Sequence, residues 1–341
     1  MAETTAIEWT EATWNPWVGC RKVSQGCKHC YMFRDQERFG QDPTKVRQTA
    51  PATFRAPLKW KEPKLIFTCS WSDFFIEEAD VWRPEAWELI RKTPQHTYQI
   101  LTKRPERILA NLPADWGRGY PNVWIGVTVE DQVAADKRIP LLLEVPTVVR
   151  FLSCEPMVGP VNLIQWLPRA RYYLGKCGKC GFTATSEFFG FNSYGDDGDV
   201  TCPTCHHAEP DEIPGLHWVI AGGESGKDAR PMHPDWARAL RDQCQVAGVA
   251  FFFKQWGEWV PMTAEEAHRE EACRLGFIDY GYMAPDGGHL PVPELGNRYG
   301  FCYGPAELEA RGCAHIARVG KKVAGRVLDG RTWDEMPEVT R

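Results

Sequence analysis

The sequence predicts an α/β fold built as a full or partial (βα) barrel, because short apolar runs alternate with amphipathic segments along most of its 341 residues. Buried parallel strands are expected at six apolar, often β-branched runs: Leu65–Thr68, Tyr98–Leu101, Val123–Val127, Val148–Leu152, Trp218–Ala221 and Val249–Phe253. Helices are expected around them, at Tyr31–Phe39, Pro84–Lys92, Pro105–Ala110, Gln132–Glu144 and Pro234–Ala247. Repeated right-handed βα units curl a parallel sheet into a barrel.

The first strand of the barrel is expected at Thr13–Val18, directly before a loop that holds Cys20, Cys27 and Cys30. Three cysteines within eleven residues favour metal binding over unligated thiols, since clustered free cysteines oxidise easily. Three thiolates can hold three irons of a [4Fe–4S] cluster and leave the fourth iron open to a small molecule. A zinc site would need a fourth protein ligand, and His29, between two of the cysteines, is expected to point away.

Polar side chains directly follow the expected strands. They are Ser70 and Asp73, Thr102 and Lys103, Thr128 and Glu130, Glu155, Gly222–Glu224, and Lys254 and Gln255. Because the carboxyl ends of parallel strands meet at one end of a barrel, these side chains are expected to converge on a single site. This expectation rests on the order of strands and polar residues alone.

Four further cysteines form two Cys-x2-Cys pairs after the fifth expected strand, Cys177 with Cys180 and Cys202 with Cys205. The 21 residues between the pairs, and the Gly and Pro turns inside them, suit a tetrahedral zinc ribbon. The stretch between the pairs is rich in Phe, Gly and Asp and cannot form its own core, so bound Zn²⁺ would supply the folding energy. A second iron–sulfur cluster is the alternative at this place.

These features predict four parts of the chain. Residues 1–174 are the first part of the barrel with the cysteine loop, 175–210 the inserted zinc-ribbon-like segment, 211–260 the last barrel strands, and 261–341 a C-terminal extension that covers the barrel. No run of eighteen apolar residues and no signal peptide is present, so no membrane partner is expected. More than half of the 13 cysteines fall in ligand-spaced clusters, which indicates metal sites in a reducing cytoplasm.

The cysteine loop also resembles that of a known family. The run Asn15-Pro16-x-x-Gly19-Cys20, followed by Gly26-Cys27-x-x-Cys30-Tyr31, resembles the cluster loop of radical S-adenosylmethionine (SAM) enzymes, most closely their spore photoproduct lyase-like branch. The usual spacing in that superfamily is Cys-x3-Cys-x2-Cys, whereas this chain has Cys-x6-Cys-x2-Cys. Six further segments resemble an uncharacterised family found in bacteria and their phages: Trp71–Phe75, Leu101–Pro105, Gly126–Glu130, Ser153–Pro156, Gly222–Gly226 and Gly320–Arg326.

The resemblance implies a barrel of the radical SAM type and reductive cleavage of SAM at a [4Fe–4S] cluster, with a reductase or flavodoxin-type electron donor. The resulting 5′-deoxyadenosyl radical would take a hydrogen atom from the substrate. Six residues are expected to hold the polar groups of SAM: Ser70, Asp73, Lys103, Thr128, Glu130 and Glu224. For Glu224 a tight turn, and for Lys103 a helix start, are structural alternatives. Cys69 and Cys154, each at a strand end, are candidate hydrogen donors, with ordinary buried thiols as the alternative.

The substrate class is predicted from charge. A net charge of −5 and a pI of about 6.0 exclude the whole chain as a polyanion binder, but the segments Lys45–Lys64 and Arg318–Arg331 are basic. With nearby aromatic residues they suit phosphate contacts and base stacking, and a solvated rim is the alternative. The zinc ribbon and the resemblance favour a nucleic acid or nucleotide substrate, for DNA repair or modification. A peptide or metabolite substrate, or a non-catalytic metal-bearing protein that binds nucleic acid, are the other hypotheses.

Overall fold

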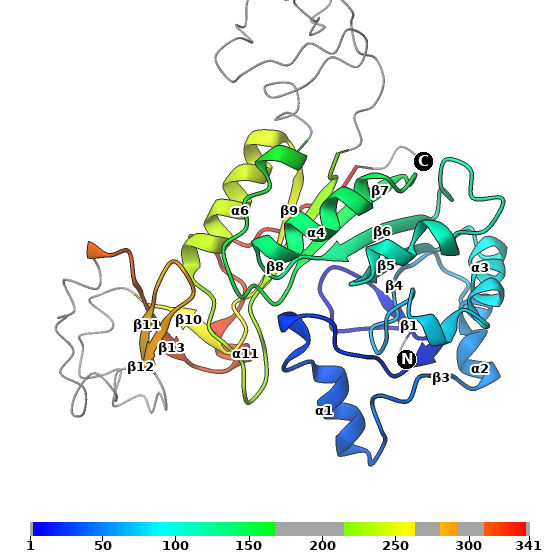
Figure 1. Cartoon of the computed structure of the whole chain (residues 1–341), viewed down its shortest axis with the longest axis horizontal. Coiled ribbons are helices and arrows are strands. Elements are labelled where there is room, and N and C mark those ends of the chain that lie inside the picture. The colour runs from blue at the N-terminus through cyan, green and yellow to red at the C-terminus, as the bar shows by residue number, and fades with distance from the viewer. Residues whose placement is uncertain (1–2, 168–214, 263–279, 292–309, 339–341) are drawn as a thin grey trace, which may run out of the picture.

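The computed structural model describes residues 3–167, 215–262, 280–291 and 310–338. Its centre is a seven-stranded parallel sheet with the order β1-β4-β5-β6-β7-β8-β9, curled into a half-barrel (Figure 1). The strands are β1 (Ala12–Trp14), β4 (Leu65–Thr68), β5 (Thr97–Thr102), β6 (Val123–Thr128), β7 (Val149–Cys154), β8 (Trp218–Gly222) and β9 (Ala250–Gln255). The predicted α/β class and partial (βα) barrel are therefore confirmed.

Helices occupy the connections between the strands. They are α1 (Tyr31–Arg38), α2 (Pro51–Phe54), α3 (Arg83–Lys92), α4 (Gln132–Leu143), α6 (Pro234–Ala247) and α11 (Lys321–Ala324). Two of them have clear sequence signals at their ends. At the start of α4 the Asp131 carboxylate accepts the backbone N–H of Ala134 at 2.8 Å, and α6 ends at Gly248, whose φ of 68° suits glycine.

The first barrel strand is shorter than expected. Instead of one strand over Thr13–Val18 there are two, and the second pairs in antiparallel fashion with another short strand: β2 (Trp17–Val18) and β3 (Arg47–Gln48). The break falls at Asn15 and Pro16. Pro16 has no N–H for a sheet, and the Asn15 side chain accepts the backbone N–H of Trp71 at 2.8 Å. The chain therefore turns away from the sheet before it reaches the cysteines.

The helix expected at Pro105–Ala110 is also different, because two short 3-10 turns replace it: Pro105–Arg107 and Leu109–Asn111. The Asn111 side chain donates to the carbonyl oxygen of Arg107 at 2.8 Å and accepts from the buried Arg83. The bond with Arg83 ties the segment to α3. Four more 3-10 turns occur in the described residues: Gln25–Cys27, Ala56–Lys59, Glu77–Ala79 and Ile164–Trp166.

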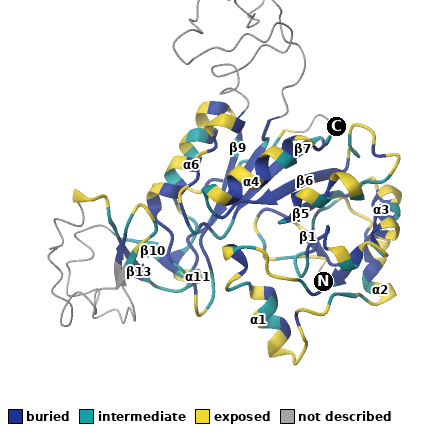
Figure 2. Ribbon diagram, viewed as in Figure 1, coloured by how far each residue is buried: buried dark blue, intermediate teal, exposed yellow. Residues whose placement is uncertain are grey.

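Both faces of the curled sheet are buried, as Figure 2 shows along β6. Outward-facing residues pack under the helices, among them Ile66, Ile100, Ile125, Leu152, Val219 and Phe251. Alternate residues of the same strands, together with Trp9 from the segment before β1, form a second cluster on the inner face: Trp9, Trp124, Val149, Phe151, Trp218, Ile220 and Phe252. Gly126 lies on this inner face, where a Cβ would come within 2.6 Å of the Phe151 ring. The aromatic cluster thus fills the half-barrel near the amino-terminal ends of its strands.

The C-terminal part forms a small antiparallel sheet beside the half-barrel, in the order β10-β13-β11-β12 (Figure 1). Its strands are β10 (Trp259–Pro261), β11 (Tyr280–Met283), β12 (His289–Pro291) and β13 (Ala314–Arg318). The chain then returns along β9, where Phe253 donates its N–H to the Trp333 carbonyl at 2.9 Å and Trp256 to that of Gly325 at 3.1 Å. This segment covers a sheet edge that would otherwise be open. The predicted zinc-ribbon segment, residues 175–210, lies outside the described residues.

Candidate functional site

A cavity of about 670 Å³ lies at the carboxyl ends of the barrel strands. Its walls come from the cysteine loop and from residues at or after every strand of the large sheet: Thr13, Ser70, Asp73, Lys103, Arg104, Thr128, Ser153, Glu155, Glu224, Lys254 and Gln255. Trp9, Phe67 and Leu101 contribute apolar surface to it. A volume of this size suits a ligand as large as a nucleotide. Five of the six residues predicted to bind SAM line the cavity, and the sixth, Glu130, is buried beside it.

The start of the cysteine loop is held close to the sheet. Gly19 has φ of 95°, and a Cβ there would collide with the backbone of Lys45, so only glycine fits. The Gly19 carbonyl accepts the hydroxyl of Ser72 at 2.6 Å, and the Gly19 N–H donates to the carbonyl of Trp71 at 3.1 Å. The loop then passes through the turn at Gln25–Cys27 and ends where α1 begins.

Cys20, Cys27 and Cys30 all line the cavity as free thiols. Burial, reinforced by the Asp73 carboxylate, raises the pKa of the Cys20 thiol to about 11, although the Arg104 guanidinium opposes this from 3.9 Å. Cys20 is therefore protonated at neutral pH and would release a proton on binding a metal. Within the described part of the chain, no three His, Cys, Asp or Glu side chains converge closely enough to hold a metal ion.

Asp73 follows β4, and its carboxylate accepts four hydrogen bonds. The donors are the backbone N–H of Phe75 at 2.9 Å, the Thr102 hydroxyl at 2.7 Å, the backbone N–H of Lys103 at 3.0 Å and the Arg104 guanidinium at 2.9 Å. Asp73 is buried, and these donors use the lone pairs of both oxygens. The carboxylate is thus fully hydrogen-bonded within the protein. It orients Arg104, and Arg104 in turn contacts the cysteine loop.

The carboxylates of Glu130 and Glu224 are likewise hydrogen-bonded to other groups of the protein. Glu130, at 1% exposure, pairs with the buried Arg138 at 2.6 Å and accepts the Ser24 hydroxyl at 2.5 Å. Glu224 takes three hydrogen bonds from Arg230, from its backbone N–H, its Nε and its Nη2, each at 2.8 Å. Three of the carboxylates predicted to bind SAM are therefore occupied by basic residues of this chain.

Two other polar side chains at the mouth, Glu155 and Lys103, can still form hydrogen bonds to a ligand. The Glu155 Oε1 atom accepts from Lys254 at 2.6 Å and from Gln255 at 3.3 Å, while Oε2 has no hydrogen-bond partner among the described residues. Lys103 donates to the Thr128 hydroxyl at 3.1 Å, with Glu130 3.9 Å away. Glu155 and Lys254 belong to the polar set that the sequence predicts at the mouth, from their places after β7 and within β9, but they were not among the six residues predicted to bind SAM.

The two candidate hydrogen donors lie in different surroundings. Cys69 lines the cavity at the end of β4 with φ of 63°, and burial raises the pKa of its thiol well above the ordinary value. Cys154 is fully buried in the outer core and does not line the cavity. The alternation of β7 explains this, because Ser153 occupies the inward-facing position and Cys154 the opposite face. Burial also raises the pKa of the Cys154 thiol.

The basic segments are less free than their composition suggests. In Arg318–Arg331, Arg326 pairs with Asp334 and Arg331 lies 3.8 Å from Glu335. Lys321 and Lys322 are exposed and form no ion pair within the described residues, and Lys321 reaches the cavity rim. Lys321 is therefore a cation at the cavity that no acidic side chain among the described residues neutralises.

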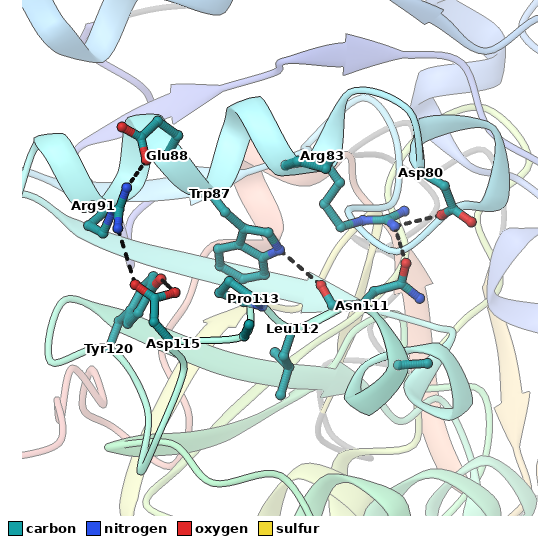
Figure 3. Close-up of a pocket in the computed structure, with 13 residues that line it drawn as sticks. Asp80, Arg83, Trp87, Glu88, Arg91, Asn111, Leu112, Pro113, Asp115 and Tyr120 are labelled. Carbon is teal, nitrogen blue, oxygen red and sulfur yellow. Dashed lines mark hydrogen bonds and ion pairs between the residues drawn. The ribbon is translucent and has the colours of Figure 1, made fainter.

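A second cavity of about 410 Å³ lies between α3 and the chain around residues 110–120 (Figure 3). Its polar groups are bonded to one another. Arg83 donates to Asp80 at 2.5 Å, Trp87 donates to the carbonyl of Asn111 at 3.0 Å, and Arg91 contacts Asp115 at 3.2 Å (Figure 3). These bonds join α3 to the following loop and leave little polar capacity for a ligand. The barrel mouth is the better candidate site.

Fold and site together define an α/β half-barrel protein with a three-cysteine loop at the mouth of its parallel sheet. The chain belongs to the family described as "Protein of unknown function (DUF5131)", whose model matches residues 4–337. No curated protein matches the chain, and no solved structure does so. None of the described helices is long and apolar enough to cross a membrane.

Proposed function

We propose that this protein is an enzyme of the radical SAM type, which cleaves SAM and takes a hydrogen atom from a nucleic acid or nucleotide. The observation that carries the proposal is the position of the cysteine loop. Cys20, Cys27 and Cys30 follow the first strand of a parallel half-barrel and open on the same cavity as the ends of the other strands. A fold of this kind supports many reactions, so the proposal rests on the loop and not on the barrel.

The donor set fits a [4Fe–4S] cluster in its chemistry, since three thiolates suffice when one iron is left for a ligand. The three side chains do not converge in the structure, and they would have to turn toward one another to hold a cluster. Such a cluster would supply the electron that cleaves SAM. Arg104, 3.9 Å from the Cys20 sulfur, favours the thiolate form that a metal requires.

The residues with unused capacity fit the methionine end of SAM. Glu155 Oε2 can accept a hydrogen bond from an ammonium group, and Lys103 can donate to a carboxylate. The apolar surface from Trp9, Phe67 and Leu101 would exclude water beneath the ligand. Because its pKa is raised, Cys69 keeps its S–H bond at neutral pH, as a hydrogen-atom donor must.

The substrate class is inferred from the cationic side chains of the cavity. Lys321 lines the cavity without an ion pair among the described residues and would suit a phosphate group, whereas Arg21 and Arg34, which also line it, pair with Glu78 and Asp35 and would have to exchange these partners for a phosphate. Mobility-shift measurements with DNA and RNA at two salt concentrations test this class, because phosphate contacts weaken as salt rises. Salt-insensitive or absent binding would favour a peptide or metabolite substrate.

Anaerobic reconstitution tests the reaction type. We expect about four irons per chain, a brown absorption that is lost in a variant with all three loop cysteines changed to alanine, and slow release of 5′-deoxyadenosine when reduced protein meets SAM. Iron content that is unchanged in the triple variant would contradict the cysteine assignment. An intact cluster that neither binds nor cleaves SAM would favour a metal-bearing protein that binds nucleic acid without catalysis.

A further inference from the structure

The six residues between Cys20 and Cys27, Arg21–Gly26, form a strap across the mouth of the half-barrel, and other elements hold it at three points. The Arg104 guanidinium donates to the carbonyl oxygen of Arg21 at 3.0 Å. The Ser24 hydroxyl donates to the Glu130 carboxylate at 2.5 Å. The Arg230 guanidinium donates to the carbonyl oxygen of Gln25 at 3.1 Å. Each contact thus reaches a different part of the strap.

In each of these contacts, the residue that holds the strap also forms a buried or half-buried ion pair. The pairs are Arg104 with Asp73 at 2.9 Å, Arg138 with Glu130 at 2.6 Å, and Arg230 with Glu224 at 2.8 Å. They come from the ends of β4, β5, β6 and β8 and from α4, so they approach the strap from separate sides. Since each carboxylate is paired within the protein, the side chain facing the strap is held in one orientation before any ligand arrives.

The strap also packs closely against Glu130 at Gly26. A Cβ at this position would overlap the Glu130 side chain, so the strap lies directly against that carboxylate. The Ser24 hydroxyl also lies 3.8 Å from the sulfur of Cys27, which is 9% exposed. A continuous chain of contacts therefore runs from Arg138 through Glu130 and Ser24 to a cysteine of the loop.

We infer that Asp73, Glu130 and Glu224 are positioning residues, which fix the strap and thereby hold Cys20 and Cys27 at the cavity wall before metal binds. Their value for catalysis rests on the proposed function, but the positioning itself is a property of the folded chain. It assigns to three strand-end carboxylates a role other than contact with a ligand. It also gives the long spacing between the first two cysteines a purpose, since a shorter connection would lack these contacts.

Labelling of single cysteines in the reduced, metal-free protein tests the inference. N-ethylmaleimide labelling followed by mass spectrometry gives a separate rate for Cys27, which requires local opening of the strap, and for Cys244, which requires opening of the core. The variant Ser24→Ala removes the contact of the strap with Glu130, together with the 3.8 Å contact between Ser24 and Cys27, and leaves the Glu130–Arg138 pair intact. We expect the ratio of the Cys27 rate to the Cys244 rate to rise about tenfold to a hundredfold, as for the loss of one hydrogen bond to a charged group.

The matched control is Glu155→Gln, which breaks an ion pair that lines the same cavity but has no hydrogen bond to the strap among the described residues. We expect the ratio to stay unchanged in this variant. An unchanged ratio in Ser24→Ala, or an equal rise in both variants, would overturn the inference. Because no metal is present in this experiment, its failure would refute the positioning role alone, whereas a chain that binds no iron would refute the proposed function alone.

Discussion

The pair of Glu130 and Arg138 offers the sharpest test of how the cysteine loop is supported. Both side chains are buried, at 1% and 5% exposure, and their charged atoms are 2.6 Å apart. The change Glu130→Gln keeps the shape of the side chain but leaves the guanidinium without its counter-charge. Breaking a buried pair in this way costs about 3–5 kcal/mol. This is a large part of the ~5–15 kcal/mol by which a typical domain is stable.

Urea unfolding followed by tryptophan fluorescence measures this loss, because Trp124 and Trp218 are buried in the half-barrel. The exposed pair of Arg55 and Glu85, at 3.0 Å, provides a control of the same charge type, and Glu85→Gln should cost less than about 1 kcal/mol. Adding Arg138→Met to Glu130→Gln removes both charges and should recover much of the lost stability. If Glu130→Gln costs no more than Glu85→Gln, or if the double variant is no more stable than the single one, the reasoning about a buried anchor is wrong.

Three further predictions concern other parts of the chain. Gly126→Ala should destabilise the half-barrel by about 1–3 kcal/mol in the same unfolding assay, because the new methyl group would press on the Phe151 ring, and an unchanged midpoint would contradict the packing described. Hydrogen bonding to Arg238 holds the pKa of Asp329 below its usual range, so this contribution to stability persists at neutral pH and is lost as the pH falls through that lowered pKa; the acid limb of the unfolding profile should become less steep in Asp329→Asn, while other carboxylates with a lowered pKa, such as Asp80, maintain the rest of it. Elemental analysis should give one zinc per chain that is lost in Cys177→Ser while the circular dichroism of the barrel persists, and iron in excess of one cluster would instead indicate a second cluster.

Much of the barrel could be predicted from the sequence because strands buried on both faces are nearly continuous apolar runs. The run Leu65–Thr68 coincides with β4, and the expected helix over Pro234–Ala247 coincides with α6. The convergence of polar residues at one mouth followed from strand order alone. The first strand was harder to predict, since its end depends on the contact of Asn15 with the distant Trp71.

The sequence does not predict whether each candidate side chain is already hydrogen-bonded within the protein, because the partners lie far away along the chain. Ser24 and Glu130 are 106 positions apart, and Arg230 and Gln25 are 205 positions apart. Sequence order places a carboxylate after a strand but does not say whether an arginine already occupies it. Cys154 shows a second limit, since a shift of one residue along β7 decides which face of the sheet a side chain occupies.

The central claim is that the cysteine loop carries a [4Fe–4S] cluster with one iron open to SAM. Electron paramagnetic resonance of the reconstituted, reduced protein, recorded without and with SAM, tests it most directly, because a ligand on the open iron changes the spectrum of the cluster. We predict a signal of a reduced [4Fe–4S] cluster that depends on Cys20, Cys27 and Cys30 and changes on addition of SAM. A cluster signal that SAM leaves unchanged, or no cluster signal from these three cysteines, would contradict the account.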